Sequence, residues 1–352
     1  MVVERTDVVV VGAGQAGLSS AYHLRRLGVE HVVLDANPAP GGAWQHRWPT
    51  LRMATVHGIF GLPGMDFTAP DPSLRANEAV PAYFAAYEQR MGLHVRRPVT
   101  VSAVRDLGPE LLVQTDHGPL RTRGLVNATG TWTRPFWPSY PGRETFGGRQ
   151  LHAAQYRGPD ELAGHRVVVV GGGSTAVQLL PEIAAVAETL WVTRRQPRFR
   201  DDDFTPEIGR EVVSRVEDRV RRGLPPESVV SVTGLVRTPQ VAAAQAAGVL
   251  ERHPVFDRIT PDGVAWSDGR TWEADVILWC TGWRSALDHL APLRLRGPGG
   301  GIRMDGTRVA ADPRIHLVGY GPSASTVGAN RAGRSAAAEL RDLLGTSERS
   351  TA

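Results

Sequence analysis

The chain has 352 residues, and its hydrophobic content of 41% and charged content of 22% are those of an ordinary globular protein. The net charge is only +4, and its arginines form no basic stripe with interleaved aromatics, which argues against nucleic-acid binding. A single cysteine, Cys280, excludes an internal disulfide and a C-x-x-C redox pair. No apolar run approaches the ~20 residues of a membrane span, and a strand-like run replaces a signal peptide at the N-terminus. We therefore expect a cytoplasmic protein.

The first segment of the chain predicts a strand, a glycine-rich loop, a helix and a second strand. Residues 7–11 are a continuous β-branched run, as in a strand buried on both faces of a parallel sheet. Residues 18–27 carry apolar side chains at helical spacing, and 31–34 predict the next strand. This order is typical of a βαβ unit.

The loop GAGQAG matches the dinucleotide pattern G-x-G-x-x-G at Gly12, Gly14 and Gly17. The first glycine permits a tight turn, the second lets the backbone approach a pyrophosphate, and the third allows close helix packing. Asp35 ends the next strand, where an acid can hold a ribose hydroxyl pair. A plain glycine turn is the alternative, but its position between strand and helix favours dinucleotide binding.

A second glycine pair follows directly in PAPGGAW. We expect Gly42 and Trp44 to extend the surface around the first loop, which favours FAD over NAD at this site. The next part of the chain predicts a meander of strands at 99–104, 111–115 and 124–127, and Val101 is expected to join the cofactor site.

A second strand–loop–helix–strand unit begins at His165 and repeats the first about 160 positions later. Its loop GGGSTA is expected to hold a second dinucleotide with Gly171, Gly173, Ser174 and Thr175, and an alanine takes the place of the third glycine.

No acid follows the second strand of this repeat. Arg194 and Arg195 occur there instead, and arginines accommodate a 2′-phosphate where an acid would select a 2′-hydroxyl. The pattern therefore predicts NADPH over NADH, although exposed arginines at a strand end also occur without such a role.

Two further apolar strands end in a Thr-Gly turn, LVNATG and VILWCTGW. Ligands bind at the carboxyl ends of strands in such sheets, so we expect Thr129, Gly130, Thr281 and Gly282 to line the cofactor sites.

The remaining elements are helices at 205–222 and 240–250, strands at 275–279 and 315–318, and a closing helix at 328–344. We expect the N-terminus of that closing helix to point at the flavin. The histidines show no metal-ligand spacing, so no metal site is expected.

Between the two loops lies FGGRQLHAAQY, which reads F-x-G-x-x-x-H-x-x-x-Y at Phe146, Gly148, His152 and Tyr156. With both loops, GGAW, NATG and CTGW, this stretch resembles the fingerprint of the class B flavoprotein monooxygenases. The tyrosine resembles the flavin-containing monooxygenase form more than the Baeyer–Villiger form. Within that group, GGAWQHRWPTLR and HLVGYG look most similar to compact bacterial flavoproteins of the arsenite-resistance type.

The resemblance implies an α/β fold with two Rossmann-like dinucleotide-binding domains, for FAD and NADPH, the second inserted in the first. We expect the FAD domain at 1–157 and 272–352, and the NADPH domain at 158–271 with a helical insertion at about 200–250. The resemblance implies no nucleic acid or membrane partner, and a homodimer is one option for the assembly.

The activity implied is NADPH- and O2-dependent oxygenation of a small molecule. An oxygen atom passes from a C4a-(hydro)peroxyflavin to a soft nucleophile such as N, S or As. Baeyer–Villiger chemistry, an NADPH-dependent electron-transfer reductase and a redox-sensing binding protein are the alternatives.

The residue that family members place above the flavin is an asparagine, and this chain departs from that pattern. Thr55 takes that position and His57 is a second polar candidate, each as compatible with a structural role as with a catalytic one. We expect His152 to act at the domain junction, coupling the NADPH domain to the flavin.

Overall fold

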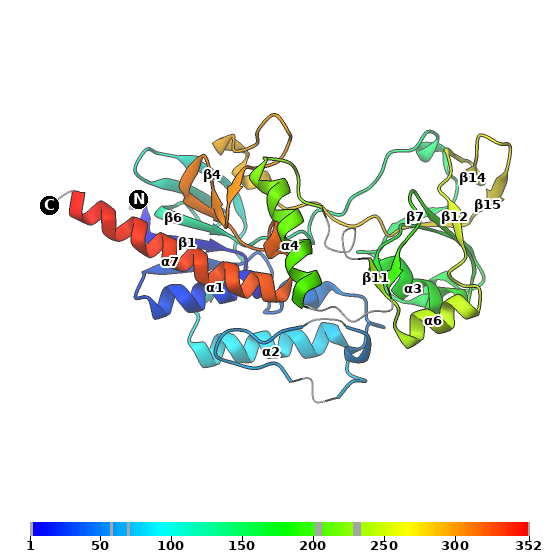
Figure 1. The fold of residues 1–352 in the computed structure, drawn as a ribbon, viewed down its shortest axis with the longest axis horizontal. Coiled ribbons are helices and arrows are strands. Elements are labelled where there is room, and N and C mark those ends of the chain that lie inside the picture. Colours follow the sequence, from blue (N-terminus) through cyan, green and yellow to red (C-terminus); the bar gives the residue numbers. More distant parts are fainter. Residues whose placement is uncertain (1–2, 57–58, 69–70, 201–205, 228–233, 351–352) are drawn as a thin grey trace.

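The structure is a computed structural model that describes residues 3–56, 59–68, 71–200, 206–227 and 234–350. Two α/β units follow one another along the long axis of the molecule, and two segments connect their main sheets (Figure 1). No described helix is long and apolar enough to cross a membrane.

A nine-stranded sheet forms the core of the first unit. The order β17-β18-β19-β6-β1-β2-β3 includes a parallel centre of β19, β6, β1 and β2, and β5 and β4 extend from β6 as an antiparallel meander. The strands are β1 (Glu4–Val11), β2 (His31–Leu34), β3 (Val95–Arg96), β4 (Val101–Asp106), β5 (Leu111–Thr115), β6 (Leu120–Asn127), β17 (Met304–Asp305), β18 (Arg308–Val309) and β19 (Asp312–Leu317).

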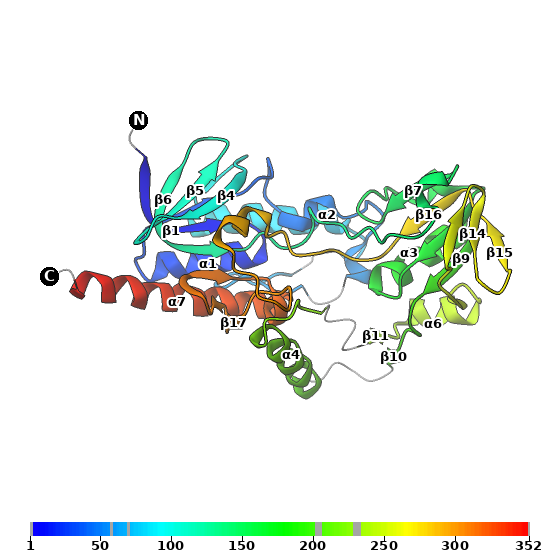
Figure 2. The same cartoon turned by 90° about the horizontal axis from the view of Figure 1, so that it is seen from above.

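Helices α1 (Gln15–Arg26) and α7 (Thr326–Ser350) cover one face of this sheet, and α2 (Ala76–Met91) packs beside α1 (Figure 2). The contact between α1 and α7 is close, because a Cβ added to Gly333 would lie 2.7 Å from the Ser19 hydroxyl oxygen. The meander and the 3-10 turn η5 (Asp288–Leu293) cover the opposite face. The β-branched run of β1 is therefore buried on both sides, as its sequence predicts.

The second unit is a five-stranded parallel sheet in the order β12-β9-β8-β16-β7. Its strands are β7 (Arg149–His152), β8 (Arg166–Val170), β9 (Glu188–Thr193), β12 (Arg252–Pro254) and β16 (Val276–Trp279). Helices α3 (Ser174–Ala184) and α6 (Pro239–Ala246) cover one face. A small antiparallel sheet of β13 (Arg258–Thr260), β14 (Gly263–Ala265) and β15 (Thr271–Glu273) covers the other.

This topology confirms the α/β fold with two Rossmann-like units, the second inserted in the first. The expected boundaries at 157/158 and 271/272 were wrong, because β7 and β16 pair in the second sheet. Four apolar residues of β16 are buried on both faces, so the strand needs a central place in a covered sheet. The chain crosses between the sheets at 128–148 and 280–287.

The region at 200–250 is not one helical insertion in the second unit. Helix α4 (Pro206–Arg221) packs on the first unit, next to the start of α7 (Figure 2). A Cβ added to Gly321 would lie 2.9 Å from Val220 Cγ1, so α4 packs closely against the chain just before α7. Of the described elements in this region, α6 and the short strands β10 (Phe199–Arg200) and β11 (Leu235–Val236) lie with the second unit.

Candidate active site between two dinucleotide loops

The first glycine loop leads from β1 into α1. Gly12 has φ +98°, and a Cβ there would lie 2.5 Å from the Ala128 carbonyl oxygen at the end of β6. A Cβ on Gly17 would lie 1.8 Å from the Gly12 carbonyl oxygen, so the turn and the helix contact both need glycine. Gly14 has only the Gly42 Cα near it, at 3.9 Å, which leaves the loop open where a pyrophosphate would approach.

Helix α1 begins without a capping side chain. Its first-turn amides are therefore available to an anion, and the helix dipole favours a negative charge there. The Asp35 carboxylate closes the site, because it accepts hydrogen bonds from Ala13 N at 2.6 Å and Asn37 N at 2.7 Å. Asp35 is thus fixed beside the loop, as its expected ribose role requires.

The GGAW segment lies against this loop. A Cβ on Gly42 would be 2.8 Å from Gly14 Cα, and Trp44 is partly buried in the 3-10 turn η1 (Gly42–His46). Val101 begins β4, two residues after Val99, whose amide donates to the Asp35 carbonyl oxygen at 2.8 Å. Gly42 therefore borders the first loop, and Val101 begins the strand that follows a residue bonded to Asp35.

The Thr-Gly turn after β6 ties this site to the second connecting segment. The Thr129 hydroxyl donates to the Ala286 carbonyl oxygen at 2.6 Å. Gly130 has φ +60°, and a Cβ added to it would have no atom within 4 Å. The turn therefore sits where the chain returns from the second unit to the first.

The second glycine loop repeats this construction. A Cβ on Gly171 would lie 2.2 Å from the Cys280 carbonyl oxygen at the end of β16, as Gly12 meets Ala128. Gly173 has nothing within 4 Å, and α3 starts there without a capping side chain. Ser174 and Thr175 form its first turn. Ala176 is fully buried at the position of the third glycine.

Thr281 and Gly282 follow β16 beside this second loop. The Thr281 hydroxyl donates to the Phe136 carbonyl oxygen, so the turn is held by the first connecting segment. Each Thr-Gly turn is therefore next to one glycine loop, as the paired motifs predict.

The hydrogen-bond register identifies the residue of the second unit that corresponds to Asp35. Gly12 N donates to the carbonyl oxygen of Leu34, and Gly171 N donates to that of Val192. Thr193 therefore stands where the first unit has Asp35, and Arg194 and Arg195 follow it, both exposed. A hydroxyl at this position cannot repel a 2′-phosphate as a carboxylate would.

Sequence reasoning missed Arg252, which joins this site from β12. Its Nε donates to the Thr193 hydroxyl oxygen at 2.9 Å and its Nη2 to the Thr193 carbonyl oxygen at 2.7 Å. Nearly sixty positions separate the two residues, so only the pairing of β12 with β9 brings this third arginine near Arg194 and Arg195.

The groups implied by the two loops fit this geometry. Both helices begin without a side chain that caps their first-turn amides, and both central glycines leave the space that a pyrophosphate needs. The first loop would hold FAD through Gly14 and Asp35. The second would hold the NADPH pyrophosphate at Gly173.

The fingerprint residues make contacts that hold the second unit together. A Cβ on Gly148 would lie 2.4 Å from the Asp275 carbonyl oxygen and 2.6 Å from Phe146 Cζ, so the crossing requires glycine. His152 is fully buried; it accepts from Ala154 N at 3.1 Å through Nδ1, which leaves Nε2–H to donate to the Gly282 carbonyl oxygen at 3.2 Å. Burial lowers the pKa of His152, consistent with this neutral tautomer.

Tyr156 links the fingerprint to the first unit. Its hydroxyl donates to Glu182 Oε1 on α3 at 2.8 Å, and the same oxygen accepts from the Thr50 hydroxyl at 3.0 Å. Thr50 lies in the segment after GGAW, so Glu182 joins the helix of the second loop to the chain beside the first.

Thr55 belongs to the same segment, which ends in the 3-10 turn η2 (Met53–Thr55). Its hydroxyl donates to the Arg52 carbonyl oxygen at 3.0 Å, and its carbonyl oxygen accepts from Gln178 on α3 at 3.4 Å. His57, the second candidate, lies outside the described residues.

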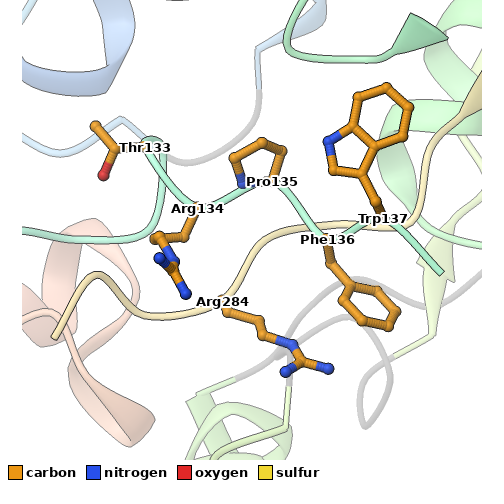
Figure 3. Close-up of a pocket in the computed structure, with 6 residues that line it drawn as sticks. All are labelled: Thr133, Arg134, Pro135, Phe136, Trp137 and Arg284. Atoms are coloured by element: carbon orange, nitrogen blue, oxygen red, sulfur yellow. The ribbon is translucent and has the colours of Figure 1, made fainter. Parts of the chain in front are cut away.

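The two connecting segments form an open groove of about 520 Å³ (Figure 3). They pair with each other, because Phe136 N donates to Gly282 O at 2.9 Å and Arg284 N donates to Arg134 O at 2.8 Å. The Arg284 guanidinium lies 4.4 Å from the centroid of the Phe136 ring. The lining residues are Thr133, Arg134, Pro135, Phe136, Trp137 and Arg284.

No cluster of His, Cys, Asp and Glu among the described residues is arranged to hold a metal ion. The fold and the two loops thus define a flavoprotein oxidoreductase with two dinucleotide sites. Over residues 9–294 the chain matches the model of the pyridine nucleotide-disulphide oxidoreductase family, and it belongs to that family.

The structure is similar to that of a flavin-containing monooxygenase from Stenotrophomonas maltophilia, with a TM-score of 0.84 and 38% identity. The match covers 97% of this chain and 99% of that one. An uncharacterized oxidoreductase CzcO from Bacillus velezensis is 26% identical over 291 residues, which is 80% of this chain and 82% of that protein. A Baeyer-Villiger monooxygenase from Streptomyces coelicolor is 30% identical over 232 residues, 63% of this chain and 43% of that protein.

These similarities confirm the predicted resemblance to class B monooxygenases of the flavin-containing type. The chain is an FAD-dependent oxidoreductase, with NADPH as its second cofactor.

Proposed function

We propose that the protein is an NADPH- and O2-dependent monooxygenase that adds one oxygen atom to a soft nucleophile containing N, S or As. The observation that supports this most is the match to a flavin-containing monooxygenase over nearly the whole of both chains. The chain also has one cysteine, which is buried, so it cannot pass electrons to a disulfide of its own.

When bound, FAD and NADPH supply hydride transfer and the activation of O2. The chain's own residues position these groups and exclude water. In this proposal Gly12, Gly14 and Gly17 hold the flavin nucleotide, and Gly173 with the first turn of α3 holds the NADPH pyrophosphate. The first unit is accordingly the FAD domain and the second the NADPH domain.

The Thr55 hydroxyl can help orient oxygen only through a new hydrogen bond. It now donates to the Arg52 carbonyl oxygen, and a hydroxyl has a single proton to donate. We propose that it changes partner when the site is filled. A Thr55→Val variant that loses coupling of oxygenation to NADPH oxidation, with normal flavin reduction, would support this role.

We propose His152 as a positioning residue. It fixes the Gly282 carbonyl at the start of a connecting segment, through which the second unit is joined to the first. His152→Ala is expected to slow flavin reduction by NADPH while the FAD content stays normal, and His152→Gln, which can still donate to Gly282, should recover part of the rate.

The overall proposal is tested with the FAD-loaded protein, NADPH and ¹⁸O2 over a panel of amines, thioethers, arsenite and ketones. Oxygen label in the product, with less hydrogen peroxide than NADPH consumed, is the expected result for at least one soft nucleophile. Peroxide equal to NADPH for every compound, together with fast NADPH-driven reduction of artificial electron acceptors, would instead identify a reductase. Labelled ester from a ketone alone would identify Baeyer–Villiger chemistry.

A further inference from the structure

Arg47 lies among three tryptophans, and we call these four residues the Arg47 cage. Its guanidinium carbon is 5.5 Å from the Trp44 ring centroid, 5.0 Å from that of Trp132 and 5.9 Å from that of Trp283. The rings of Trp132 and Trp283 are stacked at 5.1 Å with an interplanar angle of 22°. The guanidinium therefore lies within cation–π distance of three tryptophan rings.

The walls of the cage come from the segments that border the two dinucleotide loops. Trp44 follows Gly42, which touches the first loop at Gly14. Trp132 follows the Thr-Gly turn at the end of β6, and Trp283 follows the one at the end of β16. The cage is thus at the junction of the two units, on the side of the strand ends where ligands bind.

Among the described residues, the charge of the cage has no counter-charge. Arg47 forms no ion pair with any residue that the structure describes, and burial lowers its pKa to about 10, so it stays protonated at neutral pH. Arg47 is only partly buried, but removing even part of a charge from water without a partner is costly.

Two buried donors of the cage also lack acceptors. Arg47 Nε and Trp283 Nε1 are both shielded from solvent and unpaired within the described residues. Arginine and tryptophan side chains are hydrogen-bond donors only, so no side chain of the cage can accept from these two groups. A group with negative charge and acceptor oxygens would satisfy both these donors and the arginine charge.

We propose that the Arg47 cage is a binding site for an anionic group, a carboxylate or a phosphate, of a small molecule at the junction of the two units. Two sources share this chemistry: a carboxylate on the compound to be oxidised, and a phosphate of a dinucleotide cofactor. A planar group attached to the anion would stack on the tryptophans. Binding can be measured without turnover, so the proposal stands apart from the oxygen-transfer activity.

The test uses the oxidised, FAD-loaded protein without O2 turnover. NADP⁺ and benzoate are titrated separately by calorimetry, and FAD release is followed by flavin fluorescence. Arg47→Met removes the charge and keeps an unbranched side chain. Arg143→Met is the matched control, because Arg143 also lies over a tryptophan, 5.2 Å from the Trp137 ring centroid, but has a partner in Gln150.

We expect Arg47→Met to weaken one of the three ligands by about tenfold or more, the scale of a lost charge-assisted hydrogen bond. Weaker benzoate binding assigns the site to a substrate carboxylate, and weaker NADP⁺ or FAD binding assigns it to a cofactor phosphate. Trp283→Phe, which removes the second donor and keeps an aromatic ring, should weaken the same ligand and serves if Arg47→Met does not fold. Unchanged affinity for all three ligands, or equal loss in Arg143→Met, overturns the proposal.

Discussion

Asp35 and Thr193 occupy corresponding positions after the second strands of the two units, but one is a carboxylate and the other a hydroxyl. The Asp35 carboxylate beside the first loop favours a ribose with free hydroxyls. At Thr193 a hydroxyl stands in place of the carboxylate, Arg252 donates to it, and the exposed Arg194 and Arg195 follow it in the sequence. The side chain at this one position in each unit therefore distinguishes the site expected for FAD from the site expected for NADPH.

The two arginines after Thr193 are expected to bind the 2′-phosphate of NADPH. An Arg194→Ala/Arg195→Ala double variant should raise the KM for NADPH by about ten- to a hundredfold, because it removes charge-assisted hydrogen bonds of about 1.5–3 kcal/mol. The KM for NADH should change much less, since NADH has no 2′-phosphate. Steady-state kinetics with both nucleotides measure this difference. Arg149→Ala, which removes an exposed arginine paired with Glu161, is the control. An equal rise for both nucleotides would contradict the assignment.

The position of Gly148 beside two strands explains why the fingerprint has a glycine there. β7 starts one residue later and must lie against β16, whose preceding residue Asp275 presents its carbonyl oxygen to Gly148. Gly148→Ala should lower the free energy of unfolding by about 1–3 kcal/mol, because backbone must shift to admit a methyl group.

The adjacent glycine provides the control for this prediction. A Cβ on Gly147 would have only the Pro261 carbonyl oxygen near it, at 3.2 Å, so Gly147→Ala should cost clearly less. Urea unfolding of both variants gives the comparison. Equal losses would mean that the Asp275 contact does not explain the fingerprint glycine.

Local patterns were enough to predict most elements of both sheets. The G-x-G loops, the β-branched runs and the Thr-Gly turns each depend on neighbours within a few residues, so their sequence reveals them. Arg252 and Glu182 could not be predicted as site residues, because their partners Thr193 and Thr50 lie 59 and 132 positions away. The charged, helical pattern at 205–222 likewise predicted a helix, but not which of the two units it covers.

Glu182 links the two units directly through its hydrogen bonds. It accepts from Thr50 beside the first loop and from Tyr156 within the second unit. Thr50→Val removes only the bond between units and should slow flavin reduction at saturating NADPH by about two- to tenfold, the effect of one net hydrogen bond. FAD content should not change.

The matched variant for this prediction is Tyr156→Phe, which removes the bond within the second unit. It should lower the unfolding temperature but leave the limiting rate of flavin reduction close to that of the unmodified protein. Anaerobic stopped-flow measurements distinguish the two. If Thr50→Val reduces flavin at the normal rate, Glu182 has only a structural role.

The buried histidines predict how the stability of the whole molecule depends on pH. Burial lowers the pKa of His289 and of His316 to about 4, and it also lowers that of His152. Their ordinary value is about 6.5, so below that pH the unfolded chain binds protons that the folded chain does not. The free energy of unfolding should therefore be fully present above pH 6.5 and fall as the pH drops from 6.5 to 4.

Each such histidine contributes about 1.4 kcal/mol per pH unit in this window. Burial also lowers the pKa values of His23, His31 and His46, which adds to the slope, whereas the raised pKa of the buried Glu182 carboxyl acts in the opposite direction. Urea unfolding between pH 4.5 and 8 measures it, and His316→Gln should reduce the slope by about one proton because that residue no longer titrates. A flat stability from pH 6.5 to 4.5 would mean that these side chains are not held neutral in the folded core.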